Sequence, residues 1–256
     1  MSGCEGYESI ARVYDKLNAE IDYSAWATFI ENCFDKFLLE RPSLVLDLAS
    51  GTGRMTRELR ERGYDMIGVD GSAEMLSEAL EKGSEGILYL LQDMREFELY
   101  GTVGATVCCL DSINYLLDED DVFSCFKCVH NYLDPDGVFI FDVNSPYKFE
   151  NIYGNEAYIL EDEDESGAIY CGWQNEYDEE SGICDFYLTL FEEDEDGAYL
   201  RSDEHQQERC YSMETITELL RESGFELLGI FADFNFREIN GTDDRWYIVA
   251  RAKKDI

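Results

Sequence analysis

The sequence predicts an α/β protein with a seven-stranded, mostly parallel sheet, helices on both faces of that sheet, and an inserted antiparallel β subdomain. Short apolar runs alternate with helical segments as far as residue 144, which is typical of parallel strands joined by crossover helices. From residue 145 apolar side chains recur at every second position between acidic turns, as they do in antiparallel hairpins. One more helix and two apolar runs then complete the first sheet.

The elements follow from periodicity and from turn residues. Residues 7–39 are expected to be helical, because Trp26, Phe29, Ile30, Phe34 and Phe37 lie near one helical face. Strands are expected over 43–49, 64–70, 86–94, 104–113 and 136–144, and helices over 54–63, 72–83 and 120–133. The last helix is expected over 212–224, with strands over 225–234 and 245–252. This order divides the chain into 1–144 (cover helices and core), 145–210 (inserted β lid) and 211–256 (completion of the sheet).

The charge balance disfavours nucleic acid as a partner. The chain has 57 acidic residues against 20 Lys and Arg, a formal net charge of −37, so phosphate backbones would be repelled. No apolar stretch is long enough to cross a bilayer, and the first 20 residues do not have the pattern of a signal peptide. We therefore expect a cytoplasmic protein without a membrane partner. The acidic runs are interpreted as solvated hairpin tips, with an ion, a basic partner or a salt-adapted proteome as open alternatives.

Cysteine usage agrees with a reducing compartment. The nine cysteines are scattered and several lie in apolar runs, so buried, reduced thiols are expected. Cys125 and Cys128 form a CxxC pair, but the segment around them has helical periodicity and no second pair follows. We expect no metal site.

The stretch "VLDLASGTGRM" (45–55) is a buried strand that ends in an acid and a glycine turn before a helix. Ligands bind at such turns because glycine allows close backbone approach and the helix start offers free N–H groups. A phosphate loop is excluded, because Arg54 and Met55 follow Gly53 where Lys and Ser or Thr are required. A dinucleotide fingerprint is disfavoured, because its third glycine would fall on Thr56 or Arg54.

The segment "LDLASGTG" resembles the D-x-G-x-G-x-G signature of class I S-adenosylmethionine-dependent methyltransferases, which have a Rossmann-like fold. Asp47, Ala49, Gly51 and Gly53 occupy its positions, with Ala49 in place of the usual first glycine. Within that family the pattern is most similar to bacterial small-molecule methyltransferases of the YqeM-like group. The resemblance implies S-adenosyl-L-methionine as cofactor.

Other family features follow in order, and the resemblance assigns them to the cofactor. Asp70 ends the second strand, where the family's acid binds the ribose, and Asp93 with Met94 ends the third, where adenine is read and packed. Leu110 and Asp111 lie toward the end of the fourth strand, on the methionine side. The remaining expected cofactor residues are Gly71, Met75 and Tyr14, the last as a closing aromatic for which Tyr23 and Trp26 are alternatives.

The donor of such an enzyme is already activated, so the protein must align the acceptor and exclude water, with a general base only for a protonated acceptor. His205, Arg209 and Tyr211 share one face of a predicted strand that re-enters the core, and they are the candidate catalytic residues. The candidate acceptor-binding residues at the carboxyl edge of the sheet are Asn114, Asn144 and Tyr147.

The predicted partner is a small-molecule methyl acceptor, and a homodimer is compatible with the sequence. Two alternatives stay open. One is a non-catalytic S-adenosylmethionine-binding protein that contacts a partner through its acidic hairpins. The other, less favoured, is an NAD-dependent oxidoreductase.

Overall fold

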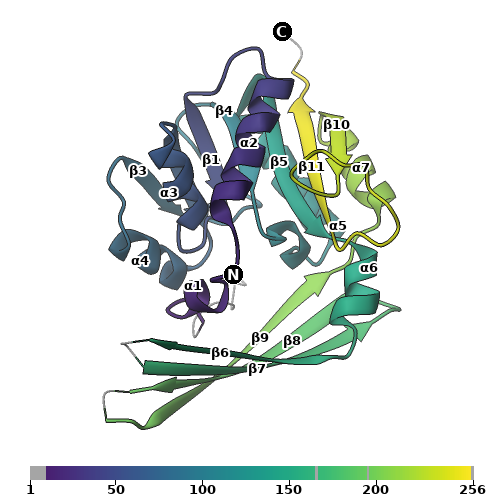
Figure 1. Ribbon diagram of the computed structural model, residues 1–256. Coiled ribbons are helices and arrows are strands. Elements are labelled where there is room, and N and C mark those ends of the chain that lie inside the picture. The colour runs from purple at the N-terminus through teal and green to yellow at the C-terminus, as the bar shows by residue number, and fades with distance from the viewer. Residues whose placement is uncertain (1–9, 165–166, 195, 255–256) are drawn as a thin grey trace.

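A seven-stranded sheet forms the centre of the molecule (Figure 1). The structure is a computed structural model that describes residues 10–164, 167–194 and 196–254. Neighbouring pairs among β1 to β5 run parallel, whereas β11 runs antiparallel to both β5 and β10. The predicted seven-stranded, mostly parallel sheet is therefore confirmed. Its order is β10 (Phe225–Phe231), β11 (Arg245–Ala252), β5 (Leu133–Asn144), β4 (Val103–Cys108), β1 (Leu44–Leu48), β2 (Asp65–Asp70) and β3 (Ile87–Leu91).

Apolar side chains on both faces of this sheet pack against helices. Along β5, Val138 and Ile140 join the cluster under α2 and α3, while Phe139 and Phe141 join the cluster under α5 and α7. Because side chains alternate along a strand, continuous apolar strands are needed to build both layers. The helices are α2 (Tyr23–Phe37), α3 (Arg54–Glu61), α4 (Ala73–Glu81), α5 (Glu119–Tyr132) and α7 (Met213–Glu222).

A separate antiparallel sheet lies beside the carboxyl ends of the parallel strands (Figure 1). Its buried face packs on Phe149 and Tyr153, and on Ile10 and Val13 near the N-terminus. The predicted antiparallel subdomain is thus confirmed as a sheet, and the division of the chain at residues 144 and 210 stays a prediction. Its strands, in spatial order, are β6 (Ala157–Asp164), β7 (Gly167–Asp178), β8 (Ile183–Glu193) and β9 (Tyr199–Arg209).

Two local features differ from the sequence prediction. The N-terminal helical region is broken into α1 (Tyr14–Leu17) and α2, because Asp22 caps a new helix by accepting a hydrogen bond from the backbone N–H of Ala25 at 2.9 Å. Residues 7–9 of the expected helical region lie outside the described residues. The helical turns α6 (Pro146–Lys148) and η2 (Phe149–Tyr153) were not predicted, and they connect β5 to the second sheet. Within the described chain, no helix combines the length and apolarity that crossing a membrane requires.

Candidate active site

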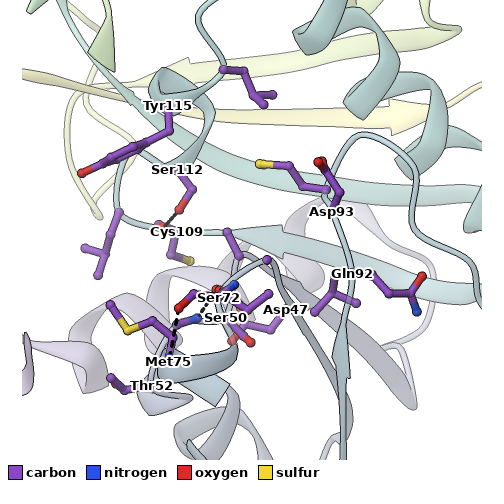
Figure 2. A pocket seen from close by; sticks show the side chains of 18 of the residues that line it. Asp47, Ser50, Thr52, Ser72, Met75, Gln92, Asp93, Cys109, Ser112 and Tyr115 are labelled. Carbon is purple, nitrogen blue, oxygen red and sulfur yellow. Dashed lines mark hydrogen bonds between the residues drawn. The ribbon is translucent and has the colours of Figure 1, made fainter. Parts of the chain in front are cut away.

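A cavity of about 720 Å³ lies at the carboxyl edge of the parallel sheet. Turns after β1, β2, β3 and β4 line it, together with Tyr23 and, from the edge strand of the second sheet, Gln207. Figure 2 shows Ser50, Thr52 and Met75 on one side of the cavity and Ser112 and Tyr115 on the other. Ten of the twelve expected cofactor residues line it: Tyr14, Asp47, Ala49, Gly51, Asp70, Gly71, Met75, Asp93, Met94 and Leu110.

The glycine turn has a left-handed backbone at each of its three signature positions. Ala49, Gly51 and Gly53 have φ values of 57°, 54° and 75°, so glycine is favoured at all three and Ala49 is strained. Gly53 does not line the cavity, and its expected cofactor role stays a prediction. A Cβ there would lie 2.2 Å from the hydroxyl oxygen of Tyr89, so this glycine serves packing against β3.

At the base of the turn, Asp47 is buried and accepts a hydrogen bond from Thr56 Oγ1 at 2.5 Å. Burial raises the pKa of Asp47 to about 7, an effect that Thr56 opposes and the nearby Asp70 reinforces. This carboxyl group is therefore engaged within the protein, where it holds the start of α3 beneath the turn.

Asp70 is oriented by the backbone. Its Oδ2 accepts from the N–H of Gly51 at 2.7 Å, and its Oδ1 accepts from the N–H of Ser72 at 2.8 Å. Burial raises its pKa, and these backbone donors oppose the rise. The backbone N–H of Gly71 also acts on this carboxylate. A carboxylate has about four acceptor positions, so it can still accept from a further donor at the cavity.

Asp93 is engaged by an arginine at the end of β3. Arg95 Nε donates to Asp93 Oδ1 at 2.9 Å, and Arg95 Nη1 donates to Asp121 Oδ2 at 2.8 Å. The hydrogen bond from Arg95 lowers the pKa of Asp93. The two acids and Arg95 all line the cavity, so its β3 side is fixed by ion pairs.

The turn after β4 has two consecutive non-glycine residues with positive φ, Leu110 at 62° and Asp111 at 55°. Such strain persists only where the surroundings hold it. Leu110 lines the cavity, but Asp111 does not. The Asp111 side chain instead binds Arg245 Nη1 at 3.0 Å and Asn144 Nδ2 at 2.7 Å, and its N–H donates to Asp142 at 2.9 Å.

These contacts belong to a buried group that joins the turn after β4 to β5, α6, β9 and β11. Asn144 Nδ2 also donates to Glu208 Oε2 at 2.8 Å, and Lys148 Nζ donates to Asn144 Oδ1 at 2.9 Å. Asn114 accepts from the N–H of Asn144 at 2.9 Å. We call this group the junction network; its members are Asp111, Asn114, Asp142, Asn144, Lys148, Glu208 and Arg245.

Charge in the junction network is unevenly compensated, because three carboxyl groups face one lysine and one arginine. Burial raises the pKa of Glu208 well above its ordinary value, and Asp111 adds to the rise. Burial alone would raise the pKa of Asp111 too, but the charges of Arg245 and Lys148 outweigh it and lower that pKa. Burial raises the pKa of Asp142 as well, so burial favours the protonated form at two of the three carboxyl groups.

The network contains three of the expected site residues, whose roles stay predictions. Asp111, Asn114 and Asn144 are enclosed in it and do not line the cavity, because long-range partners that the sequence does not reveal occupy their side chains. Tyr147 lies in the unpredicted helix α6 and also does not line the cavity.

The expected catalytic residues are not at the cavity. The His205 ring is about half exposed, stacks on Tyr187 at 4.8 Å, and lies 2.6 Å from Asp185 Oδ1. Arg209 Nη1 donates to the backbone oxygen of Leu117 at 2.8 Å, and the buried Tyr211 hydroxyl donates to that of Leu116. Strand alternation placed the three residues together, but β9 ends at Arg209 and presents only Gln207 to the cavity. Arg209 and Tyr211 hold the cavity-lining Leu116–Leu117 segment in place.

Several cavity residues were not predicted. Arg54 directly follows the glycine turn, and its position after the motif was the available signal. Tyr115 lies in η1 (Ser112–Tyr115), and its hydroxyl donates to Gln206 Oε1 at 3.1 Å, which links the core to β9. Gln207 lies between His205 and Arg209 on the predicted strand face. No local pattern separates it from them.

Comparison with known proteins identifies the family. The family model described as a methyltransferase domain matches residues 45–137. The chain is 36% identical to YqeM of Bacillus subtilis (strain 168), over 98% of each chain. The crystal structure of an S-adenosylmethionine-dependent methyltransferase from Clostridium acetobutylicum ATCC 824 is 32% identical, with a TM-score of 0.82, and the match covers 97% of this chain and 99% of that one. This chain belongs to the S-adenosylmethionine-dependent methyltransferases.

A third relative is the glycine/sarcosine N-methyltransferase of Halorhodospira halochloris, which is 34% identical over 134 residues, half of each chain. Family membership establishes the chain as an enzyme with S-adenosylmethionine as its cofactor and methyl donor. The oxidoreductase and non-catalytic alternatives are therefore not favoured. The cavity suits this donor: the oriented Asp70 carboxylate can accept from ribose hydroxyls, and the space around Gly51 is open. The individual residue assignments stay predictions.

Proposed function

We propose that the enzyme transfers the methyl group of S-adenosylmethionine to the nitrogen of a small amine. The observation that carries this proposal is the character of the lining: among the described residues no histidine faces the cavity. Burial raises the pKa of Tyr14 and of Tyr23, so both phenols stay protonated at neutral pH. Asp47 accepts from Thr56 at the base of the turn. An acceptor that brings its own lone pair fits a lining without a histidine.

The proposed reaction needs no other reactant. The neutral amine attacks the methyl carbon, the carbon–sulfur bond breaks, and its electron pair stays on sulfur to give S-adenosylhomocysteine. The methylated ammonium product then loses its extra proton to water. The protein aligns the amine with the methyl–sulfur bond and excludes water before transfer. Tyr115 and Gln207 have the polar groups on the β9 side that can orient an amine.

The second sheet is proposed to act as the wall of the acceptor site, with 1–144 and 211–256 forming the core and 145–210 the lid. Gln207 from β9 lines the cavity, and Tyr115 is tied to β9 through Gln206, which supports that role. An acceptor enclosed in this way is a small molecule. The relative named as a glycine/sarcosine N-methyltransferase supports nitrogen as the acceptor atom. Nucleic acid and membranes are not proposed as partners, the protein is proposed to work in the cytoplasm, and a homodimer stays compatible.

A methyl-transfer screen of small amines, phenols and carboxylates tests this function. We expect products only from amines, with kcat/KM rising as pH approaches the pKa of the amine itself, because the neutral form attacks. His205→Ala is the matched control and should keep the pH profile, because its ring lies outside the cavity lining. Methyl groups on oxygen, or a pH profile that His205→Ala changes, would contradict the proposal.

A further inference from the structure

The surroundings of Arg54 are unusual for a cation in so acidic a chain. Only Arg54 and Arg95 bring positive charge to the described lining of the cavity, and Arg95 is bound to Asp93 and Asp121. Among the described residues no carboxylate lies within ion-pair distance of Arg54, although the chain has 57 acidic residues. An anion that enters the cavity therefore meets one uncompensated guanidinium.

The guanidinium is positioned by weak contacts that leave donors unused. Its carbon lies 4.3 Å from the centre of the Tyr23 ring, and Nη1 lies 3.5 Å from the backbone oxygen of Asn18, at the limit of a hydrogen bond. A guanidinium held over an aromatic ring is attracted by the ring face and keeps N–H groups for other acceptors. A planar fork held in this way suits a carboxylate, which it can bind through two parallel hydrogen bonds.

We propose that Arg54 binds the α-carboxylate of the methionine half of S-adenosylmethionine. Arg54 is the first residue of α3, directly after the glycine turn, so the N–H groups at the start of this eight-residue helix add to the attraction for an anion. The end of the turn thus offers a cation and free backbone N–H groups to the carboxylate of the donor's amino acid half.

The position of Arg54 indicates contact with the methyl donor and not with the methyl acceptor. Its neighbours are residues of the core turn and of the N-terminal helices, whereas the proposed acceptor wall comes from η1 and β9. Thr52, the residue two before it, donates to Asp15 Oδ1 at 2.6 Å, which fastens the N-terminal segment over this turn. Arg54 is therefore a binding residue for the donor, and its effect is measurable without any acceptor.

Calorimetry with two ligands tests this assignment in the absence of acceptor. Wild-type protein should bind S-adenosylmethionine about 10- to 100-fold more tightly than decarboxylated S-adenosylmethionine, the scale of hydrogen bonds to a charged group. Arg54→Ala should bind S-adenosylmethionine more weakly by that same factor. It should bind the decarboxylated ligand with an affinity within about twofold of wild type. Arg54→Lys should recover only part of the loss, because an ammonium group lacks the planar fork.

Arg60→Ala is the matched control, because Arg60 lies on the same helix but pairs with Asp65 at 2.8 Å outside the cavity lining. It should leave both affinities unchanged. The assignment is overturned if wild-type protein does not discriminate between the two ligands, or if Arg54→Ala binds both as wild type does. A variant that binds the donor normally but shows a raised KM for an amine would instead place the contact on the acceptor. If the variant fails to fold, Arg54→Lys and the wild-type ligand pair still decide the outcome.

Discussion

Backbone N–H groups orient the Asp70 carboxylate at the cavity. With its oxygens oriented by Gly51 and Ser72, the carboxylate should accept from both ribose hydroxyls. We predict that Asp70→Ala weakens S-adenosylmethionine binding by about 2–3 kcal/mol, the scale of hydrogen bonds to a charged group. Calorimetry measures this directly. Asp65→Ala, which removes an exposed acid from the start of the same strand, is the control. Equal affinity of Asp70→Ala and wild type would remove the assignment.

Ala49 tests the backbone strain of the glycine turn. Its φ of 57° costs an alanine about 1–2 kcal/mol, whereas glycine gives up about 0.5–1 kcal/mol of unfolded-chain entropy. Ala49→Gly should therefore raise the free energy of unfolding by about 0.5–1 kcal/mol, measured by chemical denaturation. Gly51→Ala is the opposite substitution at a second left-handed position, with φ 54° and open space around an added Cβ. It should lower the free energy of unfolding by a similar amount. A stabilised Gly51→Ala would refute the strain argument.

The residues recovered from the sequence are those whose role follows from local position. Asp70 ends β2 and Asp93 closely follows β3. The carboxyl ends of parallel strands share one edge, so their meeting at the cavity could be predicted. Asp111 and Asn144 also lie at strand ends. They do not line the cavity, because their side chains are bound to Arg245 and Glu208, which are distant in sequence. Arg54 was missed as a ligand residue because its lack of a carboxylate partner is visible only in three dimensions.

At the level of elements, the junction network attaches β9 to the core through Glu208, a buried carboxyl group whose pKa is raised by burial. A raised folded-state pKa means that the folded protein binds the proton of this group more tightly than the unfolded chain. The stabilisation is complete below the ordinary pKa of 4.5 and is lost as pH rises toward the folded-state pKa. Glu208→Gln keeps an oxygen that can accept from Asn144 but does not titrate.

We predict that the stability of Glu208→Gln relative to wild type increases as pH rises above about 4.5, by at most about 1.4 kcal/mol per pH unit. Urea denaturation at a series of pH values measures the difference. Glu176→Gln, which alters an exposed carboxyl on β7, controls for the loss of one surface charge. A difference between Glu208→Gln and wild type that is constant with pH would show that Glu208 is already ionised in the folded protein.

The helices and strands of the core could be predicted because their periodicity is local. Continuous apolar runs such as Val138–Phe141 identified buried parallel strands, and alternation identified the second sheet. The turns α6 and η2 were missed because "NSPYKFENIYG" has no helical stripe long enough to detect. Their burial depends on Phe149 and Tyr153 packing against the second sheet, a tertiary contact.

At the scale of the whole molecule, the net charge of −37 should exclude nucleic acids as substrates. We predict no submicromolar affinity for tRNA or duplex DNA at physiological salt, because few phosphates can be neutralised and few counterions released. A gel-shift titration across salt concentrations checks this, with a basic nucleic-acid-binding protein as the positive control. Tight, salt-sensitive binding would overturn the prediction.

The placement of the second sheet could be anticipated only in outline. The sequence indicates that the insertion leaves the core after β5, at the carboxyl edge. Which strand reaches the cavity depends on the packing of its buried face on η2 and the N-terminal segment. That packing brings Gln207 to the cavity and leaves His205 outside it.

We expect one cavity to bind the donor along the glycine turn, with the methyl group directed toward β9. A crystal structure of the protein with S-adenosylhomocysteine tests it most directly. We predict the ribose on Asp70, the carboxylate on Arg54, and the sulfur facing the space between Tyr14, Tyr115 and Gln207. A ligand bound outside this cavity, or a sulfur directed away from β9, would contradict the account.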